Sequence, residues 1–388
     1  MDTQMTRSRI FSKMLAFTLL ILFITSCEAR SASTARAEKP GDGNEQRIML
    51  ALLLDTSNSM DGLIDQAKSQ LWRIVNELAS AKCQDGARPS IQIALYEYGN
   101  DGLPSSEGYI RLVSPLTNDL DVISEKLFAL KTNGGEEYCG QVIKVSLAQL
   151  AWSSSEADLK MIFIAGNEPF TQGEIPYQSA CALAKEKDVV VNTIFCGGFD
   201  EGVGTSWKRG ADLTGGTYMS IEQDRKTVYI QTPYDEKISA LNDKLNDTYV
   251  YYGKSGSSKK ELQMNQDVNA ERYGSANKVE RAVSKSSHAY SNSTWDLVDA
   301  AKDDEKVITR TDEAYLPEAM KGMNETQRKA YVQTKAKERS TIQAEIQVLN
   351  EKRKQYIATQ AKPTDKETLD AVMINAIKTR AKTKKLSF

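Results

Sequence analysis

A short run of oxygen-bearing side chains follows the first strongly apolar segment of the chain. Residues 48–54 are all apolar, and Asp55-Thr56-Ser57-Asn58-Ser59 comes directly after them. Magnesium takes oxygen ligands in octahedral geometry and keeps several of its waters. The hydroxyls of Ser57 and Ser59 can bind such an ion without adding charge, while Asp55 holds one of its waters or supports the ligands without touching the ion. This spacing therefore favours capture of a divalent cation that stays open to a carboxylate from a partner.

Alternating strands and helices would place this run at the edge of a sheet. Amphipathic segments such as residues 61–78 and 141–152 predict helices between the strands. The predicted strands are residues 48–54, 91–98, 109–113, 160–165, 189–196 and 217–221. The alternation predicts an α/β fold, a doubly wound, mostly parallel sheet with helices on both faces. Such sheets bind ligands beyond the carboxyl ends of their strands, where Asp55 is expected.

The motif from Asp55 to Ser59 resembles the D-x-S-x-S sequence of von Willebrand factor A (VWA) and integrin I domains. In those domains a metal-ion-dependent adhesion site (MIDAS) holds Mg²⁺. The resemblance covers residues 46–252 and implies a Rossmann-like VWA domain. Family members add a threonine from a Gly-Gly-x-Thr loop and an aspartate after the fourth strand. Here Glu137 stands where that threonine belongs, and residues 166–169 are Gly-Asn-Glu-Pro, so the aspartate is missing.

Because of these two departures, the sequence alone does not decide which residues bind the metal. Glu137 adds a charge that tightens metal binding but weakens the pull of the cation on an incoming carboxylate. Thr132 is an additional candidate, and either Asn167 or Glu168 can replace the missing aspartate. The resemblance thus implies Mg²⁺ or another divalent cation, and the ligand set Asp55, Ser57, Ser59, Glu137, Asn167 and Glu168. A degenerate site without metal is the alternative.

The first residues predict export to the cell envelope. A basic segment precedes an apolar run over residues 14–24, about half the length that a membrane-spanning helix needs. The run ends in Ile24-Thr25-Ser26-Cys27, which resembles the bacterial lipobox, so residues 1–27 form a signal peptide and Cys27 carries the lipid. Cleavage near residues 35–37 is the alternative. The residues after Cys27 lack the acidic run of surface-exported lipoproteins, which favours a periplasm-facing, lipid-anchored protein.

Charge and cysteine content narrow the function further. The formal net charge of −2 argues against nucleic acid as a general partner. His288 is the only histidine, so Ser-His-Asp or Cys-His catalysis has little to work with, and no enzyme is expected. An even number of cysteines in an oxidising compartment predicts disulfides. The candidates, apart from Cys27, are Cys83, Cys139, Cys181 and Cys196.

The remaining segments are predicted to serve the VWA domain or to extend it. Residues 28–45 are expected to form a flexible tether, residues 253–292 a polar linker, and residues 293–388 a charged, mainly helical C-terminal region. Arg353 interrupts the apolar seam of that region, and Lys335 and Arg339 occupy the seam upstream, which favours a helical hairpin broken near Pro363 over a coiled coil.

Three functions are compatible with these features. The first is a membrane-anchored binding protein that captures a protein or peptide through a carboxylate on the metal. The second is a metal-independent envelope scaffold that acts through its basic helical C-terminal region. The third is a hydrolase that uses the acidic residues of the loop at residues 132–140, although the sequence offers no nucleophile–base pair.

Overall fold

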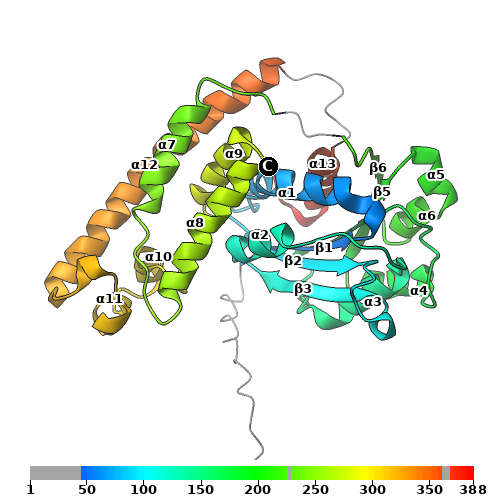
Figure 1. The fold of residues 1–388 in the computed structure, drawn as a ribbon, viewed down its shortest axis with the longest axis horizontal. Helices are drawn as coiled ribbons and strands as arrows, with labels where there is room; N and C mark the ends of the chain where they lie inside the picture. The colour runs from blue at the N-terminus through cyan, green and yellow to red at the C-terminus, as the bar shows by residue number, and fades with distance from the viewer. Residues whose placement is uncertain (1–44, 226–228, 361–367) are drawn as a thin grey trace, which may run out of the picture. The chain divides into compact units, whose positions relative to one another are not determined.

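A six-stranded sheet forms the framework of the chain (Figure 1). The computed structural model describes residues 45–225, 229–360 and 368–388. The strands are β1 (Arg47–Asp55), β2 (Ser90–Tyr98), β3 (Ile110–Thr117), β4 (Leu159–Gly166), β5 (Val190–Cys196) and β6 (Tyr218–Ile221). They are ordered β3-β2-β1-β4-β5-β6, and only β3 runs antiparallel to its neighbour. The predicted doubly wound, mostly parallel α/β fold is confirmed.

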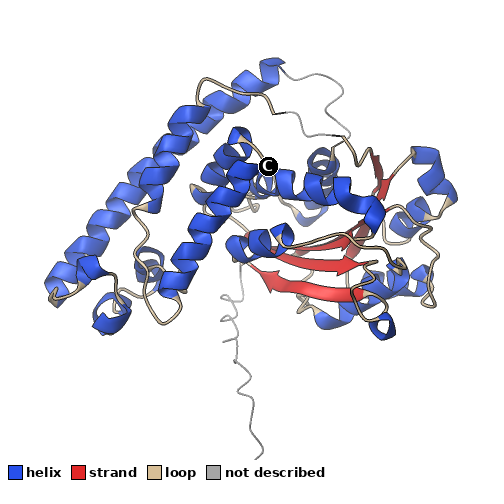
Figure 2. Cartoon of the chain, in the orientation of Figure 1, coloured by secondary structure: helices blue, strands red, loops and turns tan. Residues whose placement is uncertain are grey.

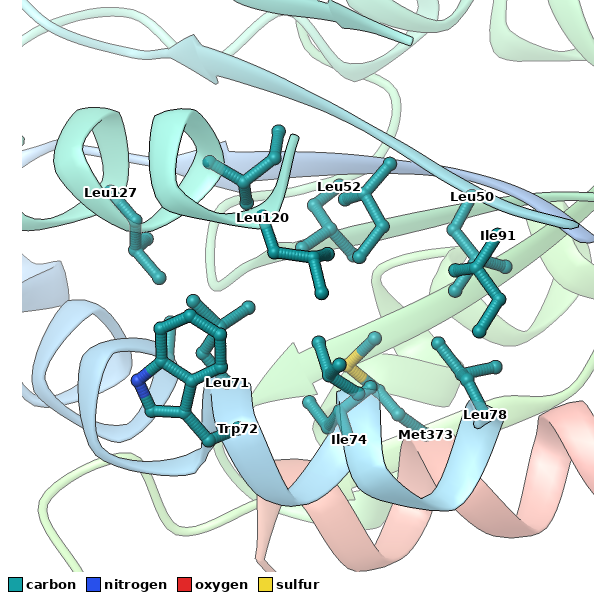
Figure 3. Close-up of a cluster of buried hydrophobic side chains, with 14 of the residues drawn as sticks. Leu50, Leu52, Leu71, Trp72, Ile74, Leu78, Ile91, Leu120, Leu127 and Met373 are labelled. Atoms are coloured by element: carbon teal, nitrogen blue, oxygen red, sulfur yellow. The ribbon is translucent and has the colours of Figure 1, made fainter. Parts of the chain in front are cut away.

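Strand β1 is apolar on both faces because both faces of the sheet are covered by helices. Leu50 and Leu52 contribute to one hydrophobic cluster, and Ala51 and Leu53 to another. Successive side chains of a strand point to opposite faces, so one continuous apolar run serves both layers. Figure 3 shows Leu50 and Leu52 above side chains of α1.

Helices cover the two faces in separate groups (Figure 2). One cluster takes side chains from α1 (Asp61–Leu78) and α2 (Leu120–Phe128). The other takes them from α3 (Cys139–Gln149), α4 (Tyr177–Glu186) and α6 (Trp207–Asp212). The short helix α5 (Phe199–Gly204) follows β5 directly. In α1 the apolar residues recur at helical spacing, which is why its buried face was readable from the sequence.

The predicted helical C-terminal region is confirmed, but the predicted polar linker over residues 253–292 is wrong. That stretch forms α8 (Gly256–Arg272) and α9 (Ser275–Lys285). Helix α8 buries polar side chains, among them Gln263, Gln266 and Asp267. Because its inward face is polar, it lacks the apolar periodicity from which a buried helix is usually predicted.

The final helix returns to the sheet. The other helices beyond β6 are α7 (Asp235–Asn246), α10 (Leu297–Asp303), α11 (Val307–Arg310), α12 (Glu325–Gln360) and α13 (Leu369–Ala381). Leu369, Met373 and Ile377 of α13 join the cluster beneath the sheet, and Figure 3 shows Met373 beside Ile74 of α1. The last helix thus packs on α1, and Pro363, where a hairpin break was predicted, lies outside the described residues.

Two arginines of the α12 seam, Arg339 upstream and Arg353, which interrupts it, are buried in ion pairs. Arg339 pairs with Asp296 (2.7 Å) and Asp299 (3.1 Å). The second, Arg353, pairs with Asp235 (3.0 Å) and with a glutamate of α9. These partners come from three other helices, so the seam of α12 is closed by charge pairing as well as by apolar contacts.

The predicted disulfides are not formed. Cys83, Cys139, Cys181 and Cys196 are all free. The Sγ atom of Cys139 lies 3.8 Å from the Tyr98 hydroxyl, and that of Cys181 lies 3.5 Å from a backbone carbonyl. Buried thiols of this kind behave as small apolar side chains. None of the helices in the described ranges combines the length and apolarity that crossing a bilayer requires. Cys27 and the tether up to residue 44 lie outside those ranges.

Candidate functional site

The turn after β1 holds a buried carboxylate that is only half satisfied. Asp55 is fully buried, and its Oδ1 accepts a hydrogen bond from the backbone amide of Ser57 (2.7 Å). Its Oδ2 is also buried and has no hydrogen-bond partner. On the same turn the Ser57 and Ser59 hydroxyls lie 3.2 Å apart. A buried, unpartnered carboxylate oxygen is costly, so a native protein that keeps one usually uses it.

The turn after β4 joins the same site. Asn167 Nδ2 donates to Ser59 Oγ (3.1 Å), which ties this turn to the one after β1. The next residue, Glu168, is partly exposed, and its backbone carbonyl accepts from Trp207 Nε1 (2.8 Å). Sheet register explains the meeting, because β1 and β4 are parallel neighbours that end at the same edge.

The loop before α3 brings in the third contributor. The amide of Asn133 donates to the Thr56 carbonyl (2.9 Å), which holds this loop against the turn after β1. A Cβ atom on Gly99 would lie 2.8 Å from both Asp55 Oδ1 and Glu137 Cγ. The two carboxylate side chains therefore lie close together beside Gly99, whose φ of +76° also favours glycine.

Thr132 is engaged elsewhere. Its hydroxyl donates to Asp61 at the start of α1. The structure therefore brings Asp55, Ser57, Ser59, Glu137 and Asn167 together, leaves Glu168 at the margin, and pairs Thr132 outside this set.

Burial dominates the electrostatics of the site. It raises the pKa of Asp55 to about 8, and the charges of Glu137 and Glu168 raise this pKa further, against the opposing effect of the backbone amide and the hydroxyl of Ser57. Burial likewise raises the pKa of Glu137 to about 7, with Glu168 adding to the rise and Ser57 opposing it. Two carboxylates that share one buried site favour a cation between them or a proton on one of them.

The donor set fits a small divalent cation. It consists of carboxylate, hydroxyl and amide oxygens, the ligands that Mg²⁺ prefers. Over the described part of the chain, no group of three or more His, Cys, Asp or Glu side chains is placed to hold a metal ion. A metal here would therefore depend on the hydroxyls of Ser57 and Ser59 and on Asn167 as well as on carboxylates. The unpartnered Oδ2 of Asp55 is the observation that favours it.

Sequence reasoning missed two supporting residues. The side-chain amide of Gln223 donates to the Ser59 carbonyl (2.8 Å), and Gln172 Oε1 accepts from the Glu137 amide (3.2 Å). Both glutamines lie on loops without a recognisable motif. Burial lowers the pKa of His288, and the charge of Arg88 lowers it further. Arg88 precedes β2, so His288 lies toward the opposite edge of the sheet from Asp55.

Comparison with known proteins adds little. No protein-family model and no curated protein matches the chain. Among solved structures, BatB from Bacteroides thetaiotaomicron is 16% identical over 45% of this chain and 90% of its own, with a TM-score of 0.34. The SpRpn10 VWA domain is 16% identical over 45% of this chain and 88% of its own, also with a TM-score of 0.34.

A third solved structure is proximal thread matrix protein 1 from the mussel byssus, described with a zinc-occupied MIDAS motif. It is 13% identical over 47% of this chain and 43% of its own, with a TM-score of 0.34. The description of the fold therefore rests on the strand order and connections of this chain and not on these low TM-scores.

Proposed function

We propose that the chain is a VWA-type binding protein of the bacterial cell envelope, anchored through Cys27, which captures a protein or peptide ligand at the Asp55 site. The observation that carries the proposal is the buried Asp55 Oδ2, which has no partner although a second buried carboxylate, Glu137, lies beside it. Serine hydroxyls and an amide oxygen complete a set of ligands for Mg²⁺ or another divalent cation.

In this proposal each residue has a separate task. Asp55 is fixed by the Ser57 amide so that Oδ2 remains available. The Asn167 amide group orients the Ser59 hydroxyl. Glu137, which is 5% exposed, is the carboxylate that replaces the neutral threonine of the family motif. A bound divalent cation supplies positive charge to which a carboxylate of the partner can bind.

Binding, rather than catalysis, is the role that we propose for this site. The acidic residues of the loop before α3 have no histidine, lysine or cysteine nucleophile in a hydrogen bond with them among the described residues. A hydrolase would lose turnover in Glu137→Gln, whereas a binding protein would show only altered metal or ligand affinity.

The direct test is a titration of the full chain with Mg²⁺ and with Mn²⁺. Calorimetry measures binding of either ion, and the electron paramagnetic resonance signal of free Mn²⁺ gives an independent measure for Mn²⁺. The wild type is compared with a variant that carries Ser57→Ala and Ser59→Ala. We expect saturable binding in the wild type and affinity at least about tenfold lower in the variant. Ser154→Ala, an exposed serine in the loop before β4, is the matched control.

Two results would contradict the proposal. The first is no metal binding by the wild type, and the second is equal binding by the double variant. Ligand capture that survives chelation would instead favour the metal-independent scaffold that acts through the basic helical C-terminal region of residues 293–388.

A further inference from the structure

Exposed carboxylates lie on the turns at the same edge of the sheet as Asp55. We call six of them the acidic rim: Asp61, Asp101, Glu136, Glu168, Asp200 and Glu201. Five of the six are exposed, and Glu168 is partly exposed. The turns that carry them, residues 55–62, 99–109, 131–138, 166–176 and 197–206, contain one basic residue, Lys131.

Backbone hydrogen bonds hold these turns together. The Thr56 amide donates to the Tyr98 carbonyl (2.9 Å), which joins the turns after β1 and β2. The Phe170 amide donates to the Thr205 carbonyl (3.0 Å), which joins the turn after β4 to the segment that follows α5. The carboxylates of the acidic rim therefore belong to one face of the sheet edge and not to scattered loops.

No lysine or arginine of the described chain forms an ion pair with the acidic rim, although carboxylates elsewhere are paired. Asp158 pairs with Arg47 (2.9 Å), and Asp119 pairs with Lys259 (2.7 Å). Like charges gathered on one face produce a potential that attracts oppositely charged partners and repels others. Among the described residues the acidic rim therefore keeps an excess of negative charge, which a cation or a basic partner would offset.

A second observation points to a ligand at this face. Asp55 is fully buried below the acidic rim, and its Oδ2 has no hydrogen-bond partner. The turns that carry the acidic rim thus include an unsatisfied acceptor, which lies next to Gly166 at the end of β4.

An exposed aromatic ring lies within the acidic rim. Phe199 is 55% exposed and precedes Asp200 and Glu201 on α5. One side of its ring packs on Tyr218, with ring centroids 5.0 Å apart. An aromatic face next to carboxylates suits lysine and arginine, because a cation can contact the ring and pair with the acid together.

We infer that the partner captured at this face is a lysine- or arginine-rich protein segment that presents a single carboxylate among its basic side chains. The inference rests on the proposed function and names the class of ligand. A divalent cation held by Asp55 and Glu137 has its charge largely offset by theirs. The acidic rim then repels an acidic peptide, so basic flanking residues must supply the remaining attraction.

The test measures binding of two synthetic peptides of equal length to the full chain in Mg²⁺. Each has a central aspartate, flanked on both sides by lysines in one peptide and by glutamates in the other. We expect the lysine-flanked peptide to bind at least about tenfold more tightly at low salt, with the difference shrinking at high salt. A third peptide, with asparagine in place of the central aspartate, reports the contribution of the carboxylate.

The rim variant combines Asp200→Asn with Glu201→Gln. The matched control combines Asp85→Asn with Glu186→Gln, exposed acids on the loop before β2 and at the end of α4. The preference for the lysine-flanked peptide should fall about threefold or more in the rim variant and persist in the control, with Mn²⁺ affinity unchanged in both. Equal affinity for the two peptides, binding of neither, or an equal loss in the control overturns the inference. Loss of Mn²⁺ binding by the wild type overturns the proposed function instead.

Discussion

Asp55→Asn tests whether the buried carboxylate governs the pH dependence of stability. In the metal-free protein the pKa of Asp55 is raised from 3.8 to about 8. A carboxyl whose folded pKa lies above its unfolded value binds its proton more tightly in the folded state. The stability that it contributes is complete below pH 3.8 and is lost as pH rises through about 8.

The size of this effect follows from the shift. Each pKa unit corresponds to about 1.4 kcal/mol, so roughly four units give about 6 kcal/mol as an upper bound. The burial of Asp55 is complete, so solvent screens little of it. Asparagine keeps the shape without an ionisable group. We therefore expect Asp55→Asn to lose much less stability than the wild type between pH 5 and 9, and to exceed the wild type at pH 9 by several kcal/mol.

The assay is urea unfolding at pH 5, 7 and 9 in a chelator, with Asp303→Asn, an exposed acid of α10, as the control. Because burial also raises the pKa of Glu137, to about 7, some slope remains in Asp55→Asn. Added Mg²⁺ at pH 8 should stabilise the wild type and leave Asp55→Asn unchanged. A variant that keeps the full wild-type fall between pH 5 and 9 would refute the reasoning.

Three further predictions concern packing, buried charge and thiols. Ile377→Ala, at a fully packed position of α13, should lower the free energy of unfolding by about 2–5 kcal/mol in urea titrations, whereas exposed Thr379→Ala should not. Arg339→Met leaves Asp296 buried without its partner and should cost about 3–5 kcal/mol at pH 7, and a cost below 1 kcal/mol would contradict this pairing. Of the described cysteines only Cys83 is partly exposed, so a thiol reagent should label Cys83 before the others, as followed by mass spectrometry. A disulfide found at Cys83 would contradict this prediction.

The fold, and the meeting of the turns that form the candidate site, were predictable because both depend on the pattern of apolar residues along short stretches of the chain. The apolar run of β1 and the amphipathic spacing in α1 are specified by residues next to each other in the chain. Once the sheet is parallel, the turns after β1 and β4 must end at one edge, which brings Asn167 to Ser59. The position of Glu137 beside Asp55 followed from the glycines of its loop.

Features that depend on distant partners were not predictable. Helix α8 lies in the stretch predicted as a linker because its inward residues are polar, and their partners are distant in the chain, such as Ser124 of α2 for Gln266 and Tyr290 for Gln263. Asp267 is satisfied by Arg281 and Lys285, two charges whose proximity no local pattern indicates. The same limit applies to the cysteines, since their even number suggested disulfides while all four described cysteines are free.

The return of α13 connects the C-terminal end of the chain to the candidate site through one side chain. Gln66 of α1 accepts a hydrogen bond from the Leu369 amide (3.2 Å) and donates to the carbonyls of Glu222 (2.9 Å) and Gln223 (2.8 Å). The Gln223 side chain in turn donates to the Ser59 carbonyl (2.8 Å). A buried polar side chain with several partners fixes the relative positions of the elements that supply them. The helix at the far end of the chain therefore helps to position the serine turn, and a fragment that stops before it lacks part of what holds the site in place.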